Sequence, residues 1–372
     1  MESPKQKSVL ISGASIAGLS TAYWMNKLGY NVTVVELADK PRTGGTAVDF
    51  RGNAIDVIKR MEIYEPVKSN ALSLETIEFK NADDVTENLL SLKKDEEENS
   101  VDEIEIERTK LISILVDEIK NDVEFMFSNS ITALTETENE MAVSFKNGSQ
   151  RTADFVFGCD GTHSIVRKIW FGDESEYMHF LDAYFSISIV DKLLISQNTM
   201  QFYNVPGKAY MLNAYKNKTD IIFCFLSEKE IPYDYRNVKQ QREIILKQFG
   251  EQGWRTAELL NEVANSENFY FDKFCQIKMP SWTKGRVALV GDAAYCASPA
   301  AGMGGSLAIE GAATLADAFR KHNGNFDLAF REYNQTLRPL VEAVQAEAEL
   351  NLSENFIPKT EEAIRRRNAA GF

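Results

Sequence analysis

Three clusters of glycine and aspartate could bind a nucleotide cofactor, and the first lies near the N-terminus. Gly13, Ser15 and Gly18 form the pattern G-x-S-x-x-G between a β-type run and a helical pattern. Such a tight turn of small residues lets helix N–H groups approach a pyrophosphate. Glu36 follows Gly18 at close to the roughly 20 residues expected for an acid that accepts from ribose hydroxyls. The cluster predicts a dinucleotide site, with a plain strand-to-helix turn as the alternative.

The second cluster lies near the other end of the chain. An apolar strand expected at residues 287–290 ends in Gly291 and Asp292, and a loop rich in alanine and glycine leads to a helix from about Ser306. Backbone N–H groups of such a loop can cradle an anion. Because the loop carries so little charge, it suits close contact with a flat, bulky group.

The third cluster is the Asp-Gly pair at Asp160 and Gly161, which ends an apolar strand, with Arg167 one helical stretch later. An isolated Asp-Gly pair is commonly a turn. Its weight as a binding motif comes from the other two clusters.

The elements around the clusters begin with a βαβ unit. Strands are expected at residues 9–11 and 32–35, on either side of a helix that ends at Gly29. A separate, mostly antiparallel sheet is expected in the middle of the chain. The short strands predicted after the first unit are 123–127, 131–135, 141–145, 185–190, 199–204, 210–215 and 221–225.

The C-terminal part predicts a long amphipathic helix at residues 326–355, with a kink expected at Pro339 and a last helix beginning at Pro358. The long helix could bridge two domains or form a dimer interface. The charged run at 93–98 is interpreted as a solvated loop, with partner binding as the alternative.

Composition excludes several classes of protein. The chain has 372 residues, a net charge of −14 and 44% hydrophobic residues. So acidic a chain is repelled by phosphate backbones, so no nucleic-acid partner is expected. No apolar run approaches the roughly 20 residues that a membrane helix needs. The four scattered cysteines and the absence of an export signal favour reduced thiols and the cytoplasm. The three histidines show no metal-ligand spacing, so no metal is expected.

Taken together, the three clusters resemble those of the class A, single-component FAD-dependent aromatic hydroxylases, the family of para-hydroxybenzoate hydroxylase, and they occur in the family's order. Within this family the greatest likeness is to the tetracycline destructases, through residues 44–52, 281–286 and 291–296.

The resemblance implies an α/β fold. A Rossmann-like, glutathione reductase-type FAD-binding domain would carry an inserted, mostly antiparallel β substrate domain and a long C-terminal helix. The implied ranges are 1–75, 101–170 and 281–322 for the FAD-binding domain, 76–100 and 171–280 for the substrate domain, and 323–372 for the bridging helix.

The resemblance also implies roles for single residues. Glu36 would bind the adenosine ribose, Asp292 the ribityl chain, and Arg108 would lie near the ribityl and pyrophosphate groups. Asp160 and Arg167 belong to a motif implicated in both FAD and NADPH contacts. The full predicted cofactor set is Gly13, Ser15, Ile16, Ala17, Gly18, Glu36, Arg108, Asp160, Asp292, Pro299, Gly302, Gly304 and Gly305. The sequence departs from the family pattern at Ser15, Tyr295, Ser306 and Glu310.

The implied activity is that of a monooxygenase with tightly bound FAD and transiently bound NADPH. A flavin C4a-hydroperoxide formed with O2 would hydroxylate a polycyclic or phenolic compound, with tetracycline-type antibiotics as the specific expectation. No catalytic side chain is expected, because the flavin carries the chemistry. The helix that begins near Gly304 would direct its positive end at the flavin. The alternatives are hydroxylation of another aromatic metabolite, and a flavoprotein that sequesters an aromatic ligand with uncoupled NADPH oxidation. A monomer is expected.

Substrate contacts are predicted at four residues of this sequence. Gln201 lies on a strand where the resemblance puts an amide-bearing contact. Phe223 and Phe225 share one face of their strand and could line the cavity, with ordinary core packing as the alternative. Arg51 would lie near flavin or substrate, with a surface salt bridge as the alternative.

Overall fold

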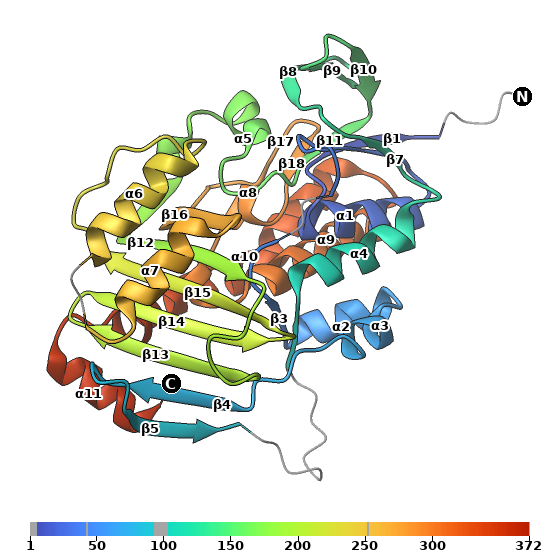
Figure 1. Cartoon of the computed structure of the whole chain (residues 1–372). Helices are drawn as coiled ribbons and strands as arrows, with labels where there is room; N and C mark the ends of the chain where they lie inside the picture. Colours follow the sequence, from blue (N-terminus) through green and yellow to red (C-terminus); the bar gives the residue numbers. More distant parts are fainter. Residues whose placement is uncertain (1–5, 42–43, 93–102, 251–252, 372) are drawn as a thin grey trace, which may run out of the picture.

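The computed structural model describes residues 6–41, 44–92, 103–250 and 253–371. Its first layer is a six-stranded sheet of order β17-β18-β11-β1-β2-β7, parallel except for β17 (Figure 1). Val9, Leu10 and Ile11 of β1 are all buried, as expected for a central strand covered on both faces. The strands are β1 (Ser8–Ser12), β2 (Asn31–Val35), β7 (Glu124–Met126), β11 (Phe155–Gly158), β17 (Thr283–Lys284) and β18 (Val287–Leu289).

Three helices pack together beside this sheet. The central one, α1 (Ile16–Lys27), packs against α4 (Arg108–Ile119) and α9 (Gly304–Lys321) (Figure 1). Ten consecutive residues of α1, from Ile16 to Met25, are buried. A helix buried all round has no free polar face, which is why this stretch of sequence shows so little amphipathic pattern.

The second layer is a seven-stranded sheet of order β16-β12-β15-β14-β13-β4-β5, antiparallel except for the β13–β4 pair. Helices α6 (Val238–Phe249) and α7 (Thr256–Asn265) cover one of its faces (Figure 1). The strands are β4 (Thr76–Lys80), β5 (Thr86–Ser91), β12 (Met178–Val190), β13 (Thr199–Val205), β14 (Lys208–Tyr215), β15 (Lys218–Leu226) and β16 (Asn268–Ile277).

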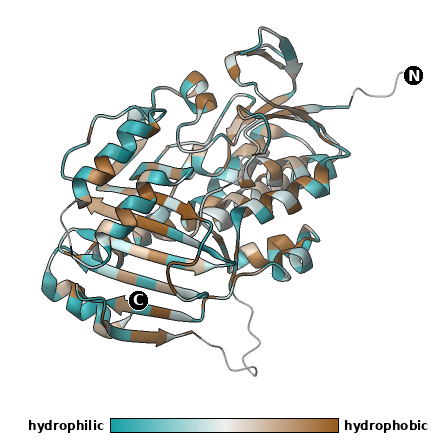
Figure 2. Ribbon diagram, viewed as in Figure 1, coloured by the Kyte–Doolittle hydropathy of each residue, from teal (hydrophilic) through white to brown (hydrophobic). Residues whose placement is uncertain are grey.

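The two faces of this large sheet carry separate apolar cores. On the face under α6 and α7, Phe223 and Phe225 pack with Phe249. On the opposite face, Phe185 and Phe202 belong to a core that also includes Ala300, before α9, and residues of the C-terminal segment. Apolar residues follow the strands of both sheets, whereas α6 and α11 carry many polar ones (Figure 2).

The remaining elements are short. A two-stranded sheet joins β3 (Val48–Arg51) to β6 (Glu103–Ile106), and a three-stranded sheet joins β8, β9 and β10. The remaining bounds are β8 (Ile131–Glu136), β9 (Met141–Phe145), β10 (Gln150–Ala153), α2 (Asn53–Arg60), α3 (Tyr64–Lys68), α5 (Ile165–Trp170), α8 (Asp292–Tyr295), η1 (Glu174–Glu176) and η2 (Pro299–Ala301).

The C-terminal segment differs in detail from the expectation. The long helix α10 (Phe326–Asn351) contains Pro339 and passes into one π-helical stretch, η3 (Leu352–Phe356). The last helix, α11 (Glu361–Ala370), begins three residues after Pro358, because the Thr360 side chain accepts from the Ala363 N–H and so fixes the start of the helix. Residues 93–98 lie outside the described part.

The expected α/β fold with an inserted, mostly antiparallel sheet and a long C-terminal helix is confirmed. The proposed division into sequence ranges stays a prediction. Each of the four cysteines is buried and free. Among the described residues, no helix is both long and apolar enough for a membrane span, and no cluster of histidine, cysteine and acidic residues could hold a metal ion.

Candidate functional site

The turn between β1 and α1 can be built only from glycine at two positions. Gly13 has φ +104°, and a Cβ there would lie 2.5 Å from the Cys159 carbonyl oxygen. A Cβ on Gly18 would lie 1.8 Å from the Gly13 carbonyl oxygen. The first turn of α1 therefore sits close against the chain that precedes it. This is the geometry in which helix N–H groups are presented to a pyrophosphate.

Glu36 comes directly after β2, and its carboxylate turns back toward the same glycine turn. Its Oε2 accepts from the Ala14 N–H at 2.8 Å, and its Oε1 accepts from the Ala38 N–H at 2.9 Å. The carboxylate is thus fixed beside the glycine turn, where a ribose contact requires it.

Arg108 begins α4 and reaches the turn from the side. Its Nη2 donates to the Ser15 Oγ at 2.8 Å. A Cβ on Gly45 would lie 3.2 Å from the Arg108 Cδ, so the chain before β3 passes close to this arginine. Serine at the second fingerprint position therefore has a use that glycine would not have, because its hydroxyl helps to orient the guanidinium. Sequence reasoning missed this contact, since the two residues are far apart in the chain.

Asp292 lies at the end of β18, where Gly291 with φ +69° turns the chain into α8. Its side chain is exposed to open space, in contrast to the buried residues that follow it. The surrounding protein raises the pKa of Asp292, and the Arg108 guanidinium partly offsets that rise. The charges of Asp292 and Arg108 therefore lie close enough to interact, and their contacts to one cofactor stay a prediction.

The loop from Ser298 to Gly304 leads into α9 through two residues with positive φ, Ser298 at +86° and Gly302 at +63°. Gly302 and Gly304 are exposed, and nothing lies within 4 Å of a Cβ added to Gly304. The N-terminal turn of α9 is therefore open to a ligand. Its positive end can face a ring that carries negative charge.

Ser306 explains one departure from the family pattern. Its Oγ donates to the Asp49 carbonyl oxygen at 3.0 Å and accepts from the Arg51 N–H at 3.2 Å. The fully buried hydroxyl thus binds β3 to α9.

Asp160 and Arg167 connect the motifs. Asp160 accepts from the Ser164 Oγ at 2.5 Å and from the Ile165 N–H at 3.0 Å, and so holds the N-terminus of α5. The fully buried Arg167 donates to the carbonyl oxygens of Thr162 at 2.5 Å and Ala293 at 2.9 Å. Arg167 therefore joins the Asp-Gly motif to the segment that carries Asp292. Contacts of Asp160 and Arg167 to a cofactor stay a prediction.

The three predicted substrate residues of the large sheet, Gln201, Phe223 and Phe225, lie on its α6 and α7 face, and their contacts to substrate stay a prediction. Phe223 and Phe225 are 0% and 1% exposed and pack against Phe249 of α6, which is the core-packing alternative. Gln201 lies on the same face, because its neighbours Met200 and Phe202 point to the opposite one, and its Nε2 donates to the Glu78 Oε2 at 2.9 Å. Alternation along a strand shows which side chains share one face of the sheet. It does not show which of the two faces is covered by α6 and α7.

Arg51 forms the surface salt bridge that was the alternative to a cofactor or substrate contact. Its guanidinium pairs with the Glu103 carboxylate at 2.5 Å, and its side chain is 47% exposed. It therefore forms a surface salt bridge, and a contact to flavin or substrate stays a prediction.

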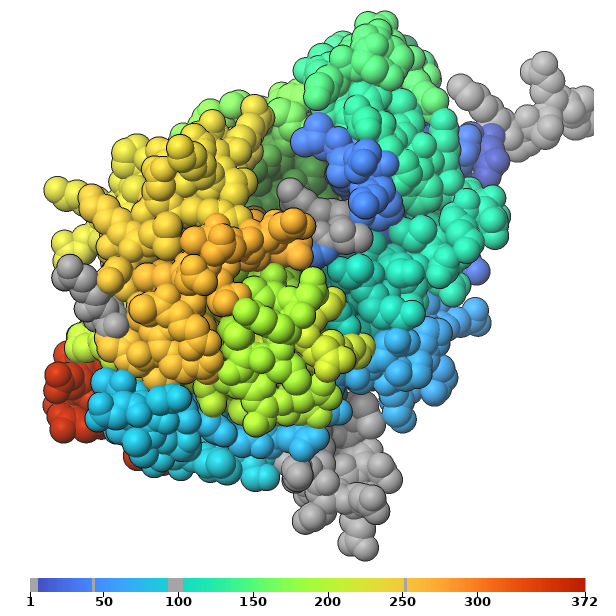
Figure 3. Space-filling model, in the orientation of Figure 1, coloured from blue at the N-terminus to red at the C-terminus, as the bar shows by residue number. Residues whose placement is uncertain are grey.

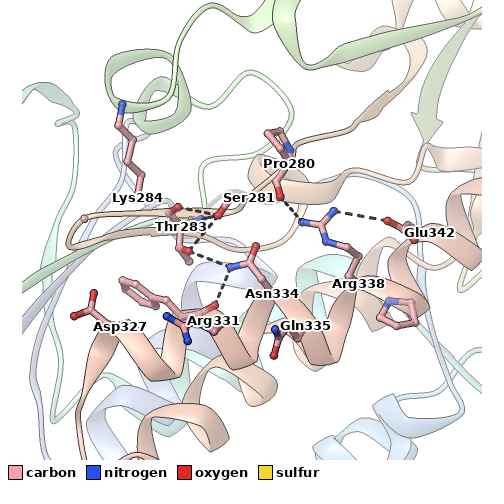
Figure 4. A pocket seen from close by; sticks show the side chains of 13 residues that line it. Pro280, Ser281, Thr283, Lys284, Asp327, Arg331, Asn334, Gln335, Arg338 and Glu342 are labelled. Atoms are coloured by element: carbon pink, nitrogen blue, oxygen red, sulfur yellow. Dashed lines mark hydrogen bonds and ion pairs between the residues drawn. The ribbon is translucent and has the colours of Figure 1, made fainter.

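A groove away from these motifs is defined by other residues (Figure 4). It has a volume of about 740 Å³ and lies between α10 and the segment that contains Pro280 and Ser281. Across it, Asn334 donates to the Thr283 Oγ1, and Arg338 donates to the Pro280 carbonyl oxygen. None of its lining residues belongs to the predicted cofactor set. The surface is also hollowed between the yellow residues around α6 and the blue residues that precede β3 (Figure 3).

A comparison with protein families matches residues 6–344 to the FAD binding domain. The chain belongs to this family. One relative of this chain is a flavin-dependent monooxygenase of Legionella longbeachae. The two are 33% identical over 362 residues, which cover 96% of this chain and 91% of the relative. The crystal structure of tetracycline destructase Tet(51) has 34% identity and a TM-score of 0.87, covering 98% of this chain and 95% of that one. Tet(55) has 33% identity and a TM-score of 0.87, covering 99% and 95%.

The chain is therefore a flavin-dependent monooxygenase of the FAD binding domain family, and the predicted resemblance to the tetracycline destructases is confirmed.

Asp292 offers a direct test of the cofactor site. Replacing Asp292 with asparagine removes an exposed carboxylate without changing its shape, and hydrogen bonds to charged groups contribute about 1.5–3 kcal/mol. We expect Asp292→Asn to raise the Kd for FAD by roughly 10- to 100-fold, measured by quenching of flavin fluorescence. The surface variant Asp317→Asn should keep the wild-type Kd, and an unchanged Kd in Asp292→Asn would remove this residue from the site.

Proposed function

We propose that this protein uses FAD, NADPH and O2 to hydroxylate tetracycline-type antibiotics. The observation that carries the proposal is the similarity to two tetracycline destructases over 98–99% of the chain with a TM-score of 0.87. The fit of the site to FAD supports it further, because the glycine turn, Glu36, Arg108 and Asp292 face one space from separate elements.

In this proposal each cofactor group has a place. The turn from Gly13 to Gly18 holds the pyrophosphate, and Glu36 accepts from the adenosine ribose. Asp292 binds the ribityl chain, with Arg108 beside it. FAD held by these residues would supply the redox chemistry, namely acceptance of hydride from NADPH and activation of dioxygen. In this proposal NADPH binds only transiently. The substrate enters beside the N-terminus of α9.

The chain itself contributes electrostatics and exclusion of water. The exposed N-terminal turn of α9, at Gly304, directs N–H groups and the helix dipole toward the ring, where they stabilise negative charge. In this proposal the apolar face of the large sheet, around Phe185, Ile187 and Ile222, covers the side of the substrate cavity opposite α9. Exclusion of water from this cavity would favour oxygen transfer to the substrate over release of hydrogen peroxide. No step requires a side chain to form a covalent bond.

The test compares NADPH oxidation by the FAD-loaded protein with and without tetracycline, and quantifies hydrogen peroxide in the same samples. The proposal expects that tetracycline stimulates NADPH oxidation and that peroxide accounts for only a small part of the NADPH consumed. Equal amounts of peroxide and oxidised NADPH, without stimulation, would favour the uncoupled flavoprotein. Stimulation by other phenols but not by tetracycline would favour hydroxylation of another aromatic metabolite.

We also propose that the enzyme works in the cytoplasm as a monomer. Four free cysteines suit a reducing compartment, where NADPH is also available. Sedimentation of the FAD-loaded protein at several concentrations tests the monomer, which should show a constant mass near 41.9 kDa.

A further inference from the structure

Three carboxyl groups, two from the β3–β6 sheet and one from the large sheet, lie near the loop that precedes α9. Asp49 of β3 and Glu105 of β6 are register partners in the two-stranded sheet. Asp49 Oδ2 lies 3.7 Å from the position of a Cβ added to Gly302. Asp220 comes from β15 of the large sheet, and its charge raises the pKa of Glu105. Lys218 of β15 pairs at 3.4 Å with Glu107, the residue directly after β6, so the strand that carries Asp220 lies beside the strand that carries Glu105.

Asp220 is the unusual member of this group. It is fully buried, and its Oδ1 accepts from the Tyr215 hydroxyl at 2.9 Å. Among the described residues, its Oδ2 has no hydrogen-bond partner. Asp220 lies on the same strand face as Ile222 and Cys224, and the core on this face includes Ala300 of the loop that precedes α9. A buried carboxylate oxygen without a donor is costly, so this oxygen calls for a donor from outside the chain.

The basic side chains near this group are fewer than the acids, and each of them pairs with at least one other acid. Arg51 pairs with Glu103 at 2.5 Å and lies 3.7 Å from the Asp49 Oδ2, so one guanidinium serves two acids. Lys216 and Lys218 pair with Glu107 at 3.1 and 3.4 Å. The region around the three acids is therefore negative, and burial raises the pKa of Asp49 to about 6 and those of Glu105 and Asp220 to about 7.

We propose that Asp49, Glu105 and Asp220 bind a protonated amine of the substrate, so that the enzyme selects cationic aromatic compounds over neutral ones and rejects benzoate-type anions. An ammonium group supplies the donors that the Asp220 Oδ2 lacks, and it compensates the three acids at once. An anionic ring substituent at the same place would meet repulsion from all three acids. The inference rests on the proposed function only for the position of the substrate, beside the α9 loop.

The test uses equilibrium binding to the FAD-loaded protein, read from the change in flavin absorbance, so that turnover is not needed. The ligands are three phenols of similar size: tyramine as the cation, 4-ethylphenol as the neutral compound and 3-(4-hydroxyphenyl)propionate as the anion. Tyramine should bind at least about tenfold more tightly than 4-ethylphenol, and the anion most weakly, for a charge-assisted contact. A cation that binds no better than its neutral analogue, or shows no binding at all, overturns the proposal.

Two variants locate the effect. Asp220→Asn and Glu105→Gln should each reduce the preference for tyramine by about tenfold while leaving the affinity for 4-ethylphenol unchanged. Glu262→Gln, on α7 and paired with Lys192, is the matched control and should keep the wild-type preference. If Asp220→Asn fails to fold, Glu105→Gln decides, and an unchanged preference there counts against the site.

The pH dependence has a defined sign. The carboxyl groups with raised pKa lose their protons between about pH 6 and 8, whereas the tyramine amine keeps its charge, so its affinity should rise over this window. The groups that face the three acids are Arg51, Glu103, Glu107, Lys218 and Tyr215. Binding of 4-ethylphenol should stay constant. A tyramine affinity that is flat or falls over the same window contradicts the assignment.

A comparison of tetracycline with 4-dedimethylaminotetracycline separates this inference from the proposed function. If both bind equally, tetracycline stays a ligand and the amine site is wrong. If neither binds while the phenols keep their order, the antibiotic assignment is wrong and the amine site stands.

Discussion

Gly18→Ala is expected to abolish FAD binding. The added methyl group would lie 1.8 Å from the Gly13 carbonyl oxygen and 3.4 Å from the Cys159 Cβ. Backbone cannot yield at that distance without opening the turn, and the turn is what presents N–H groups to the pyrophosphate. The purified variant should contain no yellow flavin, and its Kd for FAD should rise at least about 100-fold, which corresponds to roughly 3 kcal/mol.

Gly29→Ala is the matched control for this change. Gly29 ends the same helix with φ +84°, and nothing lies within 4 Å of an added Cβ. Alanine there should cost about 1 kcal/mol of the free energy of unfolding, from backbone strain alone, and should leave FAD bound. Full flavin content in Gly18→Ala would refute the assignment of the turn.

Gly311→Ala is expected to destabilise the fold by more than about 3 kcal/mol, because overpacking a rigid core is costly. A Cβ on Gly311 of α9 would lie 1.8 Å from the Tyr295 hydroxyl oxygen. That hydroxyl is held in place, since Tyr333 donates to it at 3.2 Å and Tyr295 is only 1% exposed. Urea unfolding of the FAD-loaded protein measures the loss.

A double variant identifies the cause of this loss. Tyr295→Phe removes the hydroxyl and should cost about 1 kcal/mol on its own. In the presence of Tyr295→Phe, Gly311→Ala should cost much less than it does alone, since the next contact is the Cζ at 3.0 Å. Additive effects of the two changes would show that the clash is not the reason. Tyr295 therefore requires glycine at position 311, because any larger side chain there would overlap its hydroxyl.

The sequence could predict those parts of the site that depend on local geometry. The glycine turn and Glu36 belong to one βαβ unit. The lengths of its strands, turn and helix place the Glu36 carboxylate next to the turn. The start of α9 was expected within two residues of its actual position at Gly304 for the same reason. Such features need only the chain between neighbouring elements.

Features that depend on long-range packing could not be predicted. Alternation placed Phe223 and Phe225 on one face of a strand, but the position of α6 decides that this face is core. Likewise, the Ser15–Arg108 contact and the pairing of Lys218 with Glu107 join segments from distant parts of the chain. Spacing along the sequence carries no information about such pairs.

Transfer of an oxygen atom to tetracycline is the central claim, and mass analysis of the product formed under labelled dioxygen tests it most directly. The FAD-loaded protein is incubated with NADPH, tetracycline and ¹⁸O2. The account predicts a product heavier by roughly 18 Da, and by roughly 16 Da under ordinary dioxygen, since one oxygen atom comes from the gas. Unchanged tetracycline after full consumption of NADPH would contradict the account.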